Sequence, residues 1–448
     1  MGGPARPAML VAMTSLSFAP AGSPPANAFP PWQVVDVELG EPLPGLDPHR
    51  EDAPPCGGAH LLVRLHGSPI GTVDVAFDGG PVAPAELVAL IDRELGPAIA
   101  RHLADDAQRD SPGPGTASSG APCLEDIRTQ PGLPRATVLI ATCRRPEQLE
   151  ACLESVLRSD HPDFEVVVVD NSVGDTRTAE RIRARYGDDD RVRLLEEPRP
   201  GTSRARNTGL AAAEGEIVAI TDDDVEVDRS WLRTLAVTLD RHPDVACVTG
   251  LTQPYELETA AQAWFEQFSG MGVGFTRREY HLAMQPRPSL LFPFTPGVGG
   301  SNNMAVRTEV AHRLGGFDER LGPGTPTTGG EDLDLFVRIL LGGQRIVYEP
   351  RAIVWHKHRR REDELRRHVF GYGAGALAVL TKWLLRRPEL RWQLVRQSAR
   401  LPSRIGTKGH RVGPATRPPR ALSRAQVLGY ACGPLLWLRS AALARRWP

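Results

Sequence analysis

Three consecutive aspartates, Asp222, Asp223 and Asp224, follow directly on an apolar run of the sequence. Adjacent carboxylates repel one another and contribute nothing to packing. Two carboxylates one residue apart can jointly hold a hard divalent cation that keeps some of its waters and bridges to a diphosphate. The alternative is a solvated turn or a helix cap, because Asp also favours those positions. The triplet by itself is compatible with both interpretations.

A second acidic pair, Glu331 and Asp332, lies at the predicted start of a helix. Residues 329–330 are both glycine, which allows a tight loop, and residues 333–341 have an apolar helical pattern. Free helix N–H groups favour an ionised carboxylate, so a general base here would be charged and rigidly held. The alternative is that both acids merely occupy a helix N-terminus. Asp334 is a competing candidate by proximity.

Short apolar runs alternate with helical patterns from residue 135 onward. The runs are 136–141, 164–169, 192–195 and 216–220, and the helical patterns are 146–158, 177–186 and 203–213. This alternation predicts βαβ units and a parallel sheet covered on both faces. In such sheets the ligand lies beyond the carboxyl ends of the strands. Thr142, Asp170 and Asp222 each come at the end of a predicted strand, so we expect them to converge on one crevice.

The motifs of this region, in their order, resemble those of the family 2 glycosyltransferases of the GT-A fold. The segments that carry the resemblance are Ile140-Ala-Thr-Cys-Arg-Arg-Pro-Glu, Val169-Asp-Asn-Ser, Gly201-Thr-Ser-Arg-Ala-Arg-Asn-Thr-Gly, Ile220-Thr-Asp-Asp-Asp-Val, Gly299-Gly-Ser-Asn-Asn-Met, Gly315-Gly-Phe-Asp-Glu, Gly330-Glu-Asp-Leu-Asp-Leu and Val354-Trp-His. The resemblance covers residues 135–358. It implies an α/β fold of the GT-A type, a doubly wound and mostly parallel sheet.

The resemblance also implies a nucleotide-sugar donor, with UDP favoured as the nucleotide. The residues it assigns to the donor are Thr142, Arg144, Glu147, Asp170, Asn171, Arg206, Asn207, Asp222 and Asp223. Among them, Asp170 matches the carboxylate that binds the base. Arg206 matches an element near the diphosphate, where a planar guanidinium suits phosphate oxygens.

Metal and catalytic roles follow from the same resemblance. Asp222 and Asp224 match a metal motif, and His356 matches a histidine near the metal or diphosphate, so Mg2+ or Mn2+ is the expected cofactor. Asp332, with Glu331 beside it, matches the catalytic base. The implied reaction is a single displacement that inverts the anomeric centre.

The resemblance places the acceptor beside residues 299–303, where small residues let the substrate approach the backbone. The expected acceptor is a hydroxyl of a glycan, a lipid-linked sugar or a small molecule, with a cell-envelope product. For His358, which precedes three arginines, we expect a surface position. Two alternatives remain: another phosphate enzyme, although no P-loop motif is present, and a catalytically idle protein that binds nucleotide sugars.

Composition divides the 448 residues into five regions. These are a disordered N-terminus (1–31), a small α+β module of unknown role (32–104), a linker (105–134), the GT-A domain (135–358) and a basic helical tail (359–448). An extra N-terminal module of this kind resembles actinobacterial members of the family. With 41% hydrophobic and 24% charged residues, the composition excludes wholesale disorder and a polytopic membrane protein.

The six cysteines have no CxxC spacing, which argues against a zinc ribbon or a disulfide scaffold and favours a reducing cytoplasm. Residues 1–28 contain an apolar run that imitates a secretory signal, although Met9 or Met13 could be the true start.

Charge is distributed unevenly along the chain. Residues 386–448 hold 14 Lys and Arg against one acid, whereas the rest of the chain is net acidic. A basic tail predicts contact with an anionic membrane on its inner face, and nucleic acid is the less expected polyanion. The alternative is a solvated tail. The apolar segments 369–381 and 425–438 look too short to span a membrane, so each is expected to be an interfacial or a buried helix.

Overall fold

The computed structural model describes residues 29–50, 54–109, 123, 127–269, 273–282, 298–392 and 418–444. Most of the predicted disordered N-terminus and most of the predicted linker lie outside these ranges.

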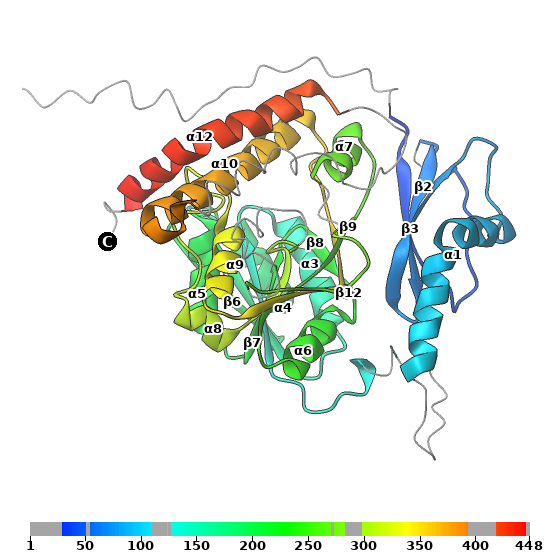
Figure 1. The fold of residues 1–448 in the computed structure, drawn as a ribbon, viewed down its shortest axis with the longest axis horizontal. Helices are drawn as coiled ribbons and strands as arrows, with labels where there is room; N and C mark the ends of the chain where they lie inside the picture. The colour runs from blue at the N-terminus through cyan, green and yellow to red at the C-terminus, as the bar shows by residue number, and fades with distance from the viewer. Residues whose placement is uncertain are drawn as a thin grey trace, which may run out of the picture.

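A nine-stranded sheet forms the centre of the molecule (Figure 1). Its first four strands in the chain are β4 (Ala136–Thr142), β5 (Phe164–Asp170), β6 (Val192–Glu196) and β7 (Ile217–Asp222). These pair in parallel in the order β7-β4-β5-β6, as the sequence predicts for buried βαβ strands.

The other half of the sheet is mixed. It contains β8 (Val225–Val227), β9 (Val245–Pro254), β10 (Arg278–Tyr280), β11 (Asn303–Arg307) and β12 (Arg345–His356). β11 runs antiparallel to both of its neighbours, β7 and β9, and thereby joins the two halves. β12 pairs in parallel with β9, so it ends at the same edge of the sheet as β9.

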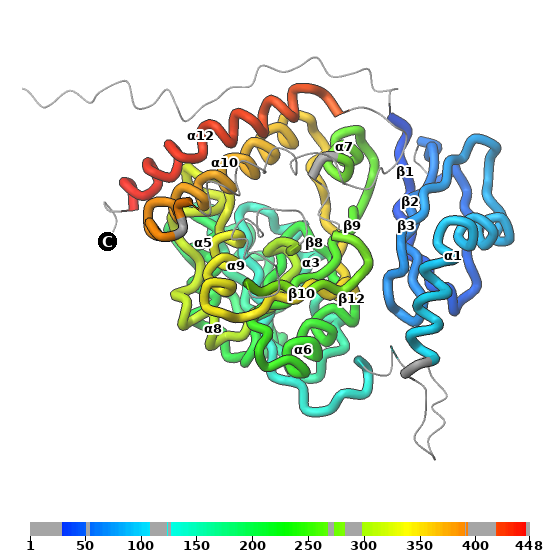
Figure 2. Tube along the Cα trace, in the orientation of Figure 1, coloured from blue at the N-terminus to red at the C-terminus, as the bar shows by residue number. Residues whose placement is uncertain are grey.

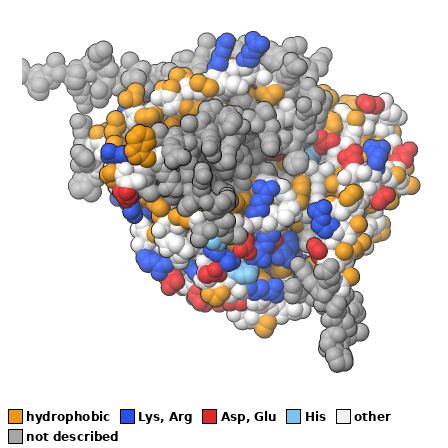
Figure 3. Space-filling model, viewed as in Figure 1, with side chains coloured by type: hydrophobic (Ala, Val, Ile, Leu, Met, Phe, Trp, Pro, Cys, Tyr) orange, Lys and Arg blue, Asp and Glu red, His pale blue; other side chains and the backbone are white. Residues whose placement is uncertain are grey.

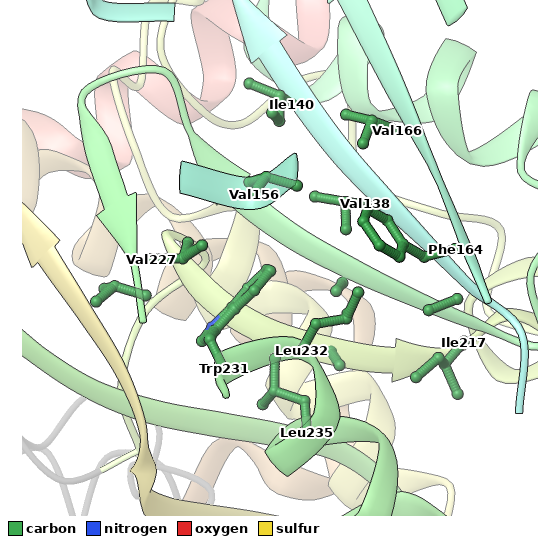
Figure 4. Packing of buried hydrophobic residues seen from close by; sticks show 14 of the residues in the cluster. Val138, Ile140, Val156, Phe164, Val166, Ile217, Val227, Trp231, Leu232 and Leu235 are labelled. Atoms are coloured by element: carbon green, nitrogen blue, oxygen red, sulfur yellow. The ribbon is translucent and has the colours of Figure 1, made fainter. Parts of the chain in front are cut away.

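Helices cover both faces of the sheet. One face packs against α3 (Pro146–Leu157), α4 (Arg177–Tyr186) and α6 (Trp231–Arg241), and the other against α5 (Thr202–Ala212), α8 (Thr308–Arg313) and α9 (Glu331–Leu341). Trp231 inserts among the aliphatic side chains of the first face (Figure 4). Its indole N–H donates to Asn303 Oδ1 at 2.9 Å, so the polar atom is satisfied within the core.

The N-terminal module has its own sheet and its own core. Its elements are β1 (Trp32–Glu38), β2 (Gly58–Leu65), β3 (Ser68–Ala76) and α1 (Pro84–Arg109). Helix α1 extends five residues past the predicted end of the module. The module lies against the β9–β12 side of the large sheet (Figure 2). Arg64 joins the two parts, since its Nη1 donates to Asp228 Oδ2 at 2.8 Å and its guanidinium lies over the Trp355 ring.

The C-terminal helices and α7 pack together on the domain of the large sheet. α7 (Ala260–Ser269), α10 (Glu362–Arg386), the short 3-10 helix η3 (Pro388–Leu390) and α12 (Arg420–Ala444) make up this layer. α10 and α12 lie side by side, and glycine lets them approach closely: a Cβ on Gly429 would meet Phe370 O at 2.2 Å. In the described part of the chain, α12 is the one helix long and apolar enough to cross a membrane. The apolar segment 425–438 lies within this helix, which extends beyond it at both ends.

Candidate active site

The strand ends bring the predicted residues together at one edge of the sheet. Thr142 and Asp170 are register partners at the ends of β4 and β5, and Asp222 pairs with Ala141 one position back. Thr142 Oγ1 donates to Asp223 Oδ2 at 2.8 Å. The parallel register therefore produces the expected convergence of these strand ends.

Arginines from separate elements neutralise the aspartate triplet. Arg145 Nη1 lies 3.0 Å from both Asp223 Oδ1 and Asp224 Oδ2. Arg359 Nη2 lies 3.2 Å from Asp224 Oδ2, and Arg206 Nη2 donates to Asp222 Oδ1 at 2.8 Å. Three adjacent carboxylates are tolerated because each one contacts a guanidinium. The sequence analysis did not single out Arg145 or Arg359, because nothing in their local sequence indicates which carboxylates they face.

The three aspartates differ in exposure, and Asp223 and Asp224 differ in proton affinity. Asp223 and Asp224 are buried, whereas the Asp222 side chain is 33% exposed. Burial and the Asp224 charge raise the pKa of Asp223 to about 6. Burial also disfavours the charged form of Asp224, but His356, Arg359 and Arg145 outweigh it and lower the pKa of this carboxyl. Asp224 is thus the carboxylate held most firmly in its charged form.

Two histidines and a glutamate form a row of polar contacts that begins at Asp224. His356, the last residue of β12, places Nε2 3.3 Å from Asp224 Oδ1, and its Nδ1 lies 2.9 Å from Nδ1 of His358. His358 Nε2 in turn lies 2.5 Å from Glu266 Oε1. His358 is buried, so the expectation of a surface position was wrong. The following arginines suggested solvent, but the turn after β12 directs the imidazole inward against α7.

A buried arginine links the triplet to the second acidic pair. Arg206 lies between Asp222 and Glu331, and its Nη1 donates to Glu331 Oε1 at 2.9 Å. Its guanidinium also lies 5.4 Å from the centre of the Phe317 ring. Burial and the neighbouring Asp332 charge raise the pKa of Glu331 to about 7, against the opposing effect of Arg206. The two acidic motifs are therefore parts of one connected cluster.

Asp332 and Asp334 have different environments. Asp332 is partly exposed, and its Oδ1 accepts a hydrogen bond from the Leu333 N–H at 2.7 Å. Burial raises the pKa of Asp332 despite that bond and the nearby Arg206. Asp334 is fully buried and is held by Arg338, Lys382 and Trp383 at 2.8, 2.5 and 3.1 Å. Asp334 is thus fully engaged in anchoring α10 to α9, which leaves Asp332 as the carboxylate able to meet a substrate.

Several residues assigned to the donor make internal contacts. Asn171 donates to the carbonyls of Glu197 and Arg199, and its Oδ1 accepts from the Gly201 N–H at 2.8 Å. Asp170 is buried, with Oδ1 accepting from the Ser172 N–H at 2.9 Å. These bonds fix the loops after β5 and β6.

Glu147 and Arg144, which were also assigned to the nucleotide-sugar donor, lie at the outside of the domain. The Glu147 side chain is 73% exposed and lies 3.3 Å from Arg181 of α4. Arg144 has a positive φ of 57°, and its N–H donates to Ser172 Oγ at 2.7 Å. Its guanidinium donates to the Val173 carbonyl at the surface.

The predicted acceptor loop and Asn207 also make structural bonds. Asn207 exchanges two hydrogen bonds with the backbone of Phe317. Asn303 donates to the carbonyls of Leu251 and Ala352 at 2.9 Å. Gly299 has a φ of 87°, and a Cβ there would meet Thr249 at 2.8 Å, which explains why glycine is required. These amides hold strands and turns in place instead of reaching the crevice.

The arrangement suits an anionic ligand and a cation. Fixed guanidinium groups, a carboxylate–imidazole pair and a partly exposed Asp222 lie at the edge where parallel sheets bind ligands. Lys and Arg side chains gather near the centre of the face shown in Figure 3. Such a set can hold a diphosphate, with a carboxylate base close by.

A doubly wound sheet with an acidic triplet at the end of a central strand defines the GT-A class of fold. Residues 137–305 match the family model for glycosyl transferase family 2. The motifs of this domain predicted that match. The N-terminal module and the C-terminal helices lie outside the match.

Curated relatives match about half of the chain. A glucosyl-dolichyl phosphate glucuronosyltransferase of Haloferax volcanii is 26% identical over 228 residues, 50% of this chain and 69% of the relative. A pre-mycofactocin glycosyltransferase of Mycobacterium tuberculosis is 32% identical over 192 residues, 42% of this chain but 37% of the relative. The fold is similar to that of a solved mannosyltransferase from Pyrobaculum calidifontis, in complex with GDP-Man and Mn2+. The TM-score is 0.44 and the sequence identity is 20%, and the match covers 80% of this chain and 97% of that chain.

Proposed function

We propose that the protein is an inverting glycosyltransferase that moves a sugar from a nucleotide diphosphate sugar to a hydroxyl acceptor. The observation that carries the proposal is the connection of the two acidic motifs through Arg206 at one sheet edge. This connection supports the proposal, because it links Glu331, the neighbour of the proposed base Asp332, to a set of groups suited to a diphosphate. UDP is favoured as the nucleotide on the family resemblance alone.

Asp224 and His356 are the residues proposed to hold Mg2+ or Mn2+. A carboxylate oxygen and an imidazole nitrogen 3.3 Å apart, both buried, fit neighbouring positions around one cation. Asp222, which pairs with Arg206 and is partly exposed, is the third proposed metal ligand and also faces the donor. The ion would act as a Lewis acid that neutralises charge on the departing diphosphate.

The mechanism follows from the positions of this chain's residues. Asp332 accepts the proton of the acceptor hydroxyl as that oxygen forms a bond to the anomeric carbon. The bond from the anomeric carbon to the diphosphate oxygen breaks, and its electron pair leaves with the nucleoside diphosphate. Arg206 and Arg145 face the developing negative charge. One displacement inverts the anomeric centre, and no covalent intermediate on the protein is needed.

We further propose a lipid-linked or envelope-glycan acceptor at the inner face of the cytoplasmic membrane. One relative's name refers to a glucosyl-dolichyl phosphate, a lipid-linked sugar. Helix α12 supports the same idea, because one of its faces is apolar and exposed. The exposed side chains recur at helical spacing, at Val427, Ala431, Leu435, Leu438 and Ala442. Such a stripe suits the interfacial region of a membrane.

Flotation with liposomes tests the membrane contact. Leu435→Glu with Leu438→Glu should reduce binding to vesicles containing anionic lipid, because two charges would enter the apolar stripe. Ser423→Glu, also exposed on α12, is the matched control. Equal flotation of the double variant and the wild type would contradict a contact through this face.

A panel of nucleotide sugars tests the proposed activity. A donor should raise the melting temperature of the wild type in the presence of Mn2+, because a ligand that binds the native state stabilises it. Release of nucleoside diphosphate should accompany this binding and should be lost in EDTA and in Asp224→Asn. Donor binding without any release, across a range of acceptors, would point instead to an idle binding protein.

A further inference from the structure

Four side chains from distant parts of the sequence meet beside the N-terminal module. His66 lies in the turn between β2 and β3, His102 and Asp106 lie one turn apart on α1, and Cys123 lies beyond that helix. His66 Nδ1 is 2.9 Å from Asp106 Oδ2, and His102 Nε2 is 3.3 Å from the same oxygen. None of these residues belongs to the candidate active site.

Cys123 completes this group, which we call the His–Cys cluster (His66, His102, Asp106 and Cys123). Its Sγ lies 3.1 Å from Asp106 Oδ2 and 3.5 Å from His102 Nε2. One donor atom from each residue lies within 4.8 Å of all the others. Cysteine spacing gave no indication of the cluster, because only one cysteine takes part and the fold supplies the other three donors.

We propose that the His–Cys cluster binds one Zn2+ ion through four protein ligands. Two imidazoles, a carboxylate and a thiolate are all donors that zinc takes, and zinc favours four ligands in a tetrahedron. With bonds of about 2.0–2.3 Å, the edges of that tetrahedron are roughly 3.3–3.7 Å long. Four of the six edges, at 2.9, 3.3, 3.1 and 3.5 Å, require shifts of only a few tenths of an ångström, and the other two, from His66 to His102 and to Cys123, are no longer than 4.8 Å.

Charge balance also favours a dication at this position. Zn2+ with the Asp106 carboxylate and the Cys123 thiolate forms a neutral unit, which can be buried without an uncompensated charge. On binding, the zinc–sulfur bond forms and the thiol proton passes to solvent, with no change of oxidation state. Cys123 is 2% exposed, whereas the His66 side chain is 28% exposed and leaves an entry path for the ion.

Four protein ligands leave no open position for substrate, so the site is structural. The ion would tie the β2–β3 turn to the end of α1 and to the chain that leads toward the catalytic domain. The turn is already constrained, since His66 has a φ of 55° and Glu38 accepts from the N–H groups of His66 and Gly67. The ion would therefore hold together the β2–β3 turn, the end of α1 and Cys123.

Metal analysis of the untagged full-length chain tests the proposal. Protein purified without chelator should contain about one zinc per chain. Cys123→Ser and His102→Asn should each lower the zinc affinity, measured by titration against a chelator, by roughly tenfold or more, because each removes one of four ligands. Cys432→Ser and His49→Asn are the matched controls outside the cluster. Asp224→Asn should retain the zinc, which separates this site from the candidate active site.

Cobalt substitution gives a second readout. Co2+ added to the metal-free wild type should produce the visible bands of a tetrahedral ion and a thiolate charge-transfer band. The charge-transfer band should be absent in Cys123→Ser, with circular dichroism confirming that this variant is folded. A wild type that takes up neither metal, or a Cys123→Ser variant that keeps both the zinc and the charge-transfer band, would overturn the proposal.

Discussion

The candidate active site and the His–Cys cluster both gather carboxylates and imidazoles, but they arrange them differently. In the active site, cationic side chains surround the acids, and Asp222 and Asp332 retain exposed surface. In the His–Cys cluster, four donor atoms converge on each other. The exposed carboxylates of the active site leave room for a substrate. Four protein donors around one point leave no room for a substrate, as in a structural metal site. The comparison predicts that equivalent substitutions affect turnover in the first region and metal content in the second.

The largest effect is expected for Asp224→Asn. This change removes the carboxylate proposed for metal binding, and several kcal/mol of charge stabilisation correspond to about a thousandfold or more in turnover. It also leaves Arg145, Arg359 and His356 with less counter-charge, so some loss of stability should accompany the loss of activity.

Steady-state rates with and without Mn2+ measure this effect. Asp244→Asn is the matched control, since Asp244 pairs with Arg345 at the opposite end of the sheet. Full Mn2+-stimulated activity in Asp224→Asn would show that the metal site lies elsewhere.

Asp334→Asn should act on stability instead. The Asp334 carboxylate bridges Arg338 and Lys382 in a buried environment, and breaking a buried ion pair costs roughly 3–5 kcal/mol of unfolding free energy. Asp332→Asn, two residues away, should change the unfolding free energy far less. Urea titrations of both variants give the comparison. The assignment of roles would be reversed if Asp334→Asn were stable and inactive while Asp332→Asn were active.

Gly375→Ala should have an intermediate effect on both stability and transfer. A Cβ at residue 375 would lie 2.5 Å from Gly329 C and 2.8 Å from Gly330 N, immediately before the acidic pair. Overpacking of this kind costs roughly 1–3 kcal/mol and should displace the loop that carries Asp332. Gly79→Ala is the control, because nothing lies within 4 Å of its added Cβ. Melting temperatures and transfer rates, measured on both variants, should not change in the control. Unchanged values in Gly375→Ala would mean that α10 does not position the base.

The smallest expected effect is a shift in the pH profile. A protonated Asp332 cannot accept the acceptor's proton, so kcat/KM should fall as the pH falls. Because burial raises the pKa of Asp332, this acid limb should lie above the ordinary Asp value of about 3.9. Glu331, with a pKa of about 7, is already mostly protonated at the pH of this limb, so Glu331→Gln should leave the limb nearly in place. An acid limb that persists unchanged in Asp332→Asn would belong to another group.

The parallel half of the fold could be read from the sequence with little error. Helix α4 matches the predicted range 177–186 at both ends, and β4 is one residue longer than predicted. Buried parallel strands are short continuous apolar runs, and amphipathic helices between them have a distinct period. Both signals are local, so a single sequence carries them.

The other half of the fold could not be predicted from the sequence, because it depends on contacts between distant segments. No local pattern indicates that β11 enters the sheet antiparallel, because its five residues resemble any short strand. Similarly, α10 packs on the catalytic region through Gly371 and Gly375, and their partners at 328–330 lie more than forty residues earlier. The position of His358 was missed for the same reason, since the arginines after it gave the stronger local signal.

The sequence indicated which acids gather at the site but not how their charges are balanced. The strand-end positions of Thr142, Asp170 and Asp222 followed from the parallel pattern. Which side chains meet them depends on tertiary packing, so the roles of Arg145 and Arg359 emerged only from the structure. Asn171 and Asn207 were assigned to donor binding from the sequence, but in the structure their amides are hydrogen-bonded to backbone groups. Their assigned roles in donor binding stay predictions.

Calorimetry of the donor, combined with product formation, tests the central claim most directly. Asp332→Asn should bind the nucleotide sugar with Mn2+ as tightly as the wild type, because Asp332 acts on the acceptor. Transfer should fall by roughly 10²–10⁴, the usual contribution of a general base. Unimpaired transfer by this variant, or a loss of donor affinity as large as the loss of transfer, would contradict the account.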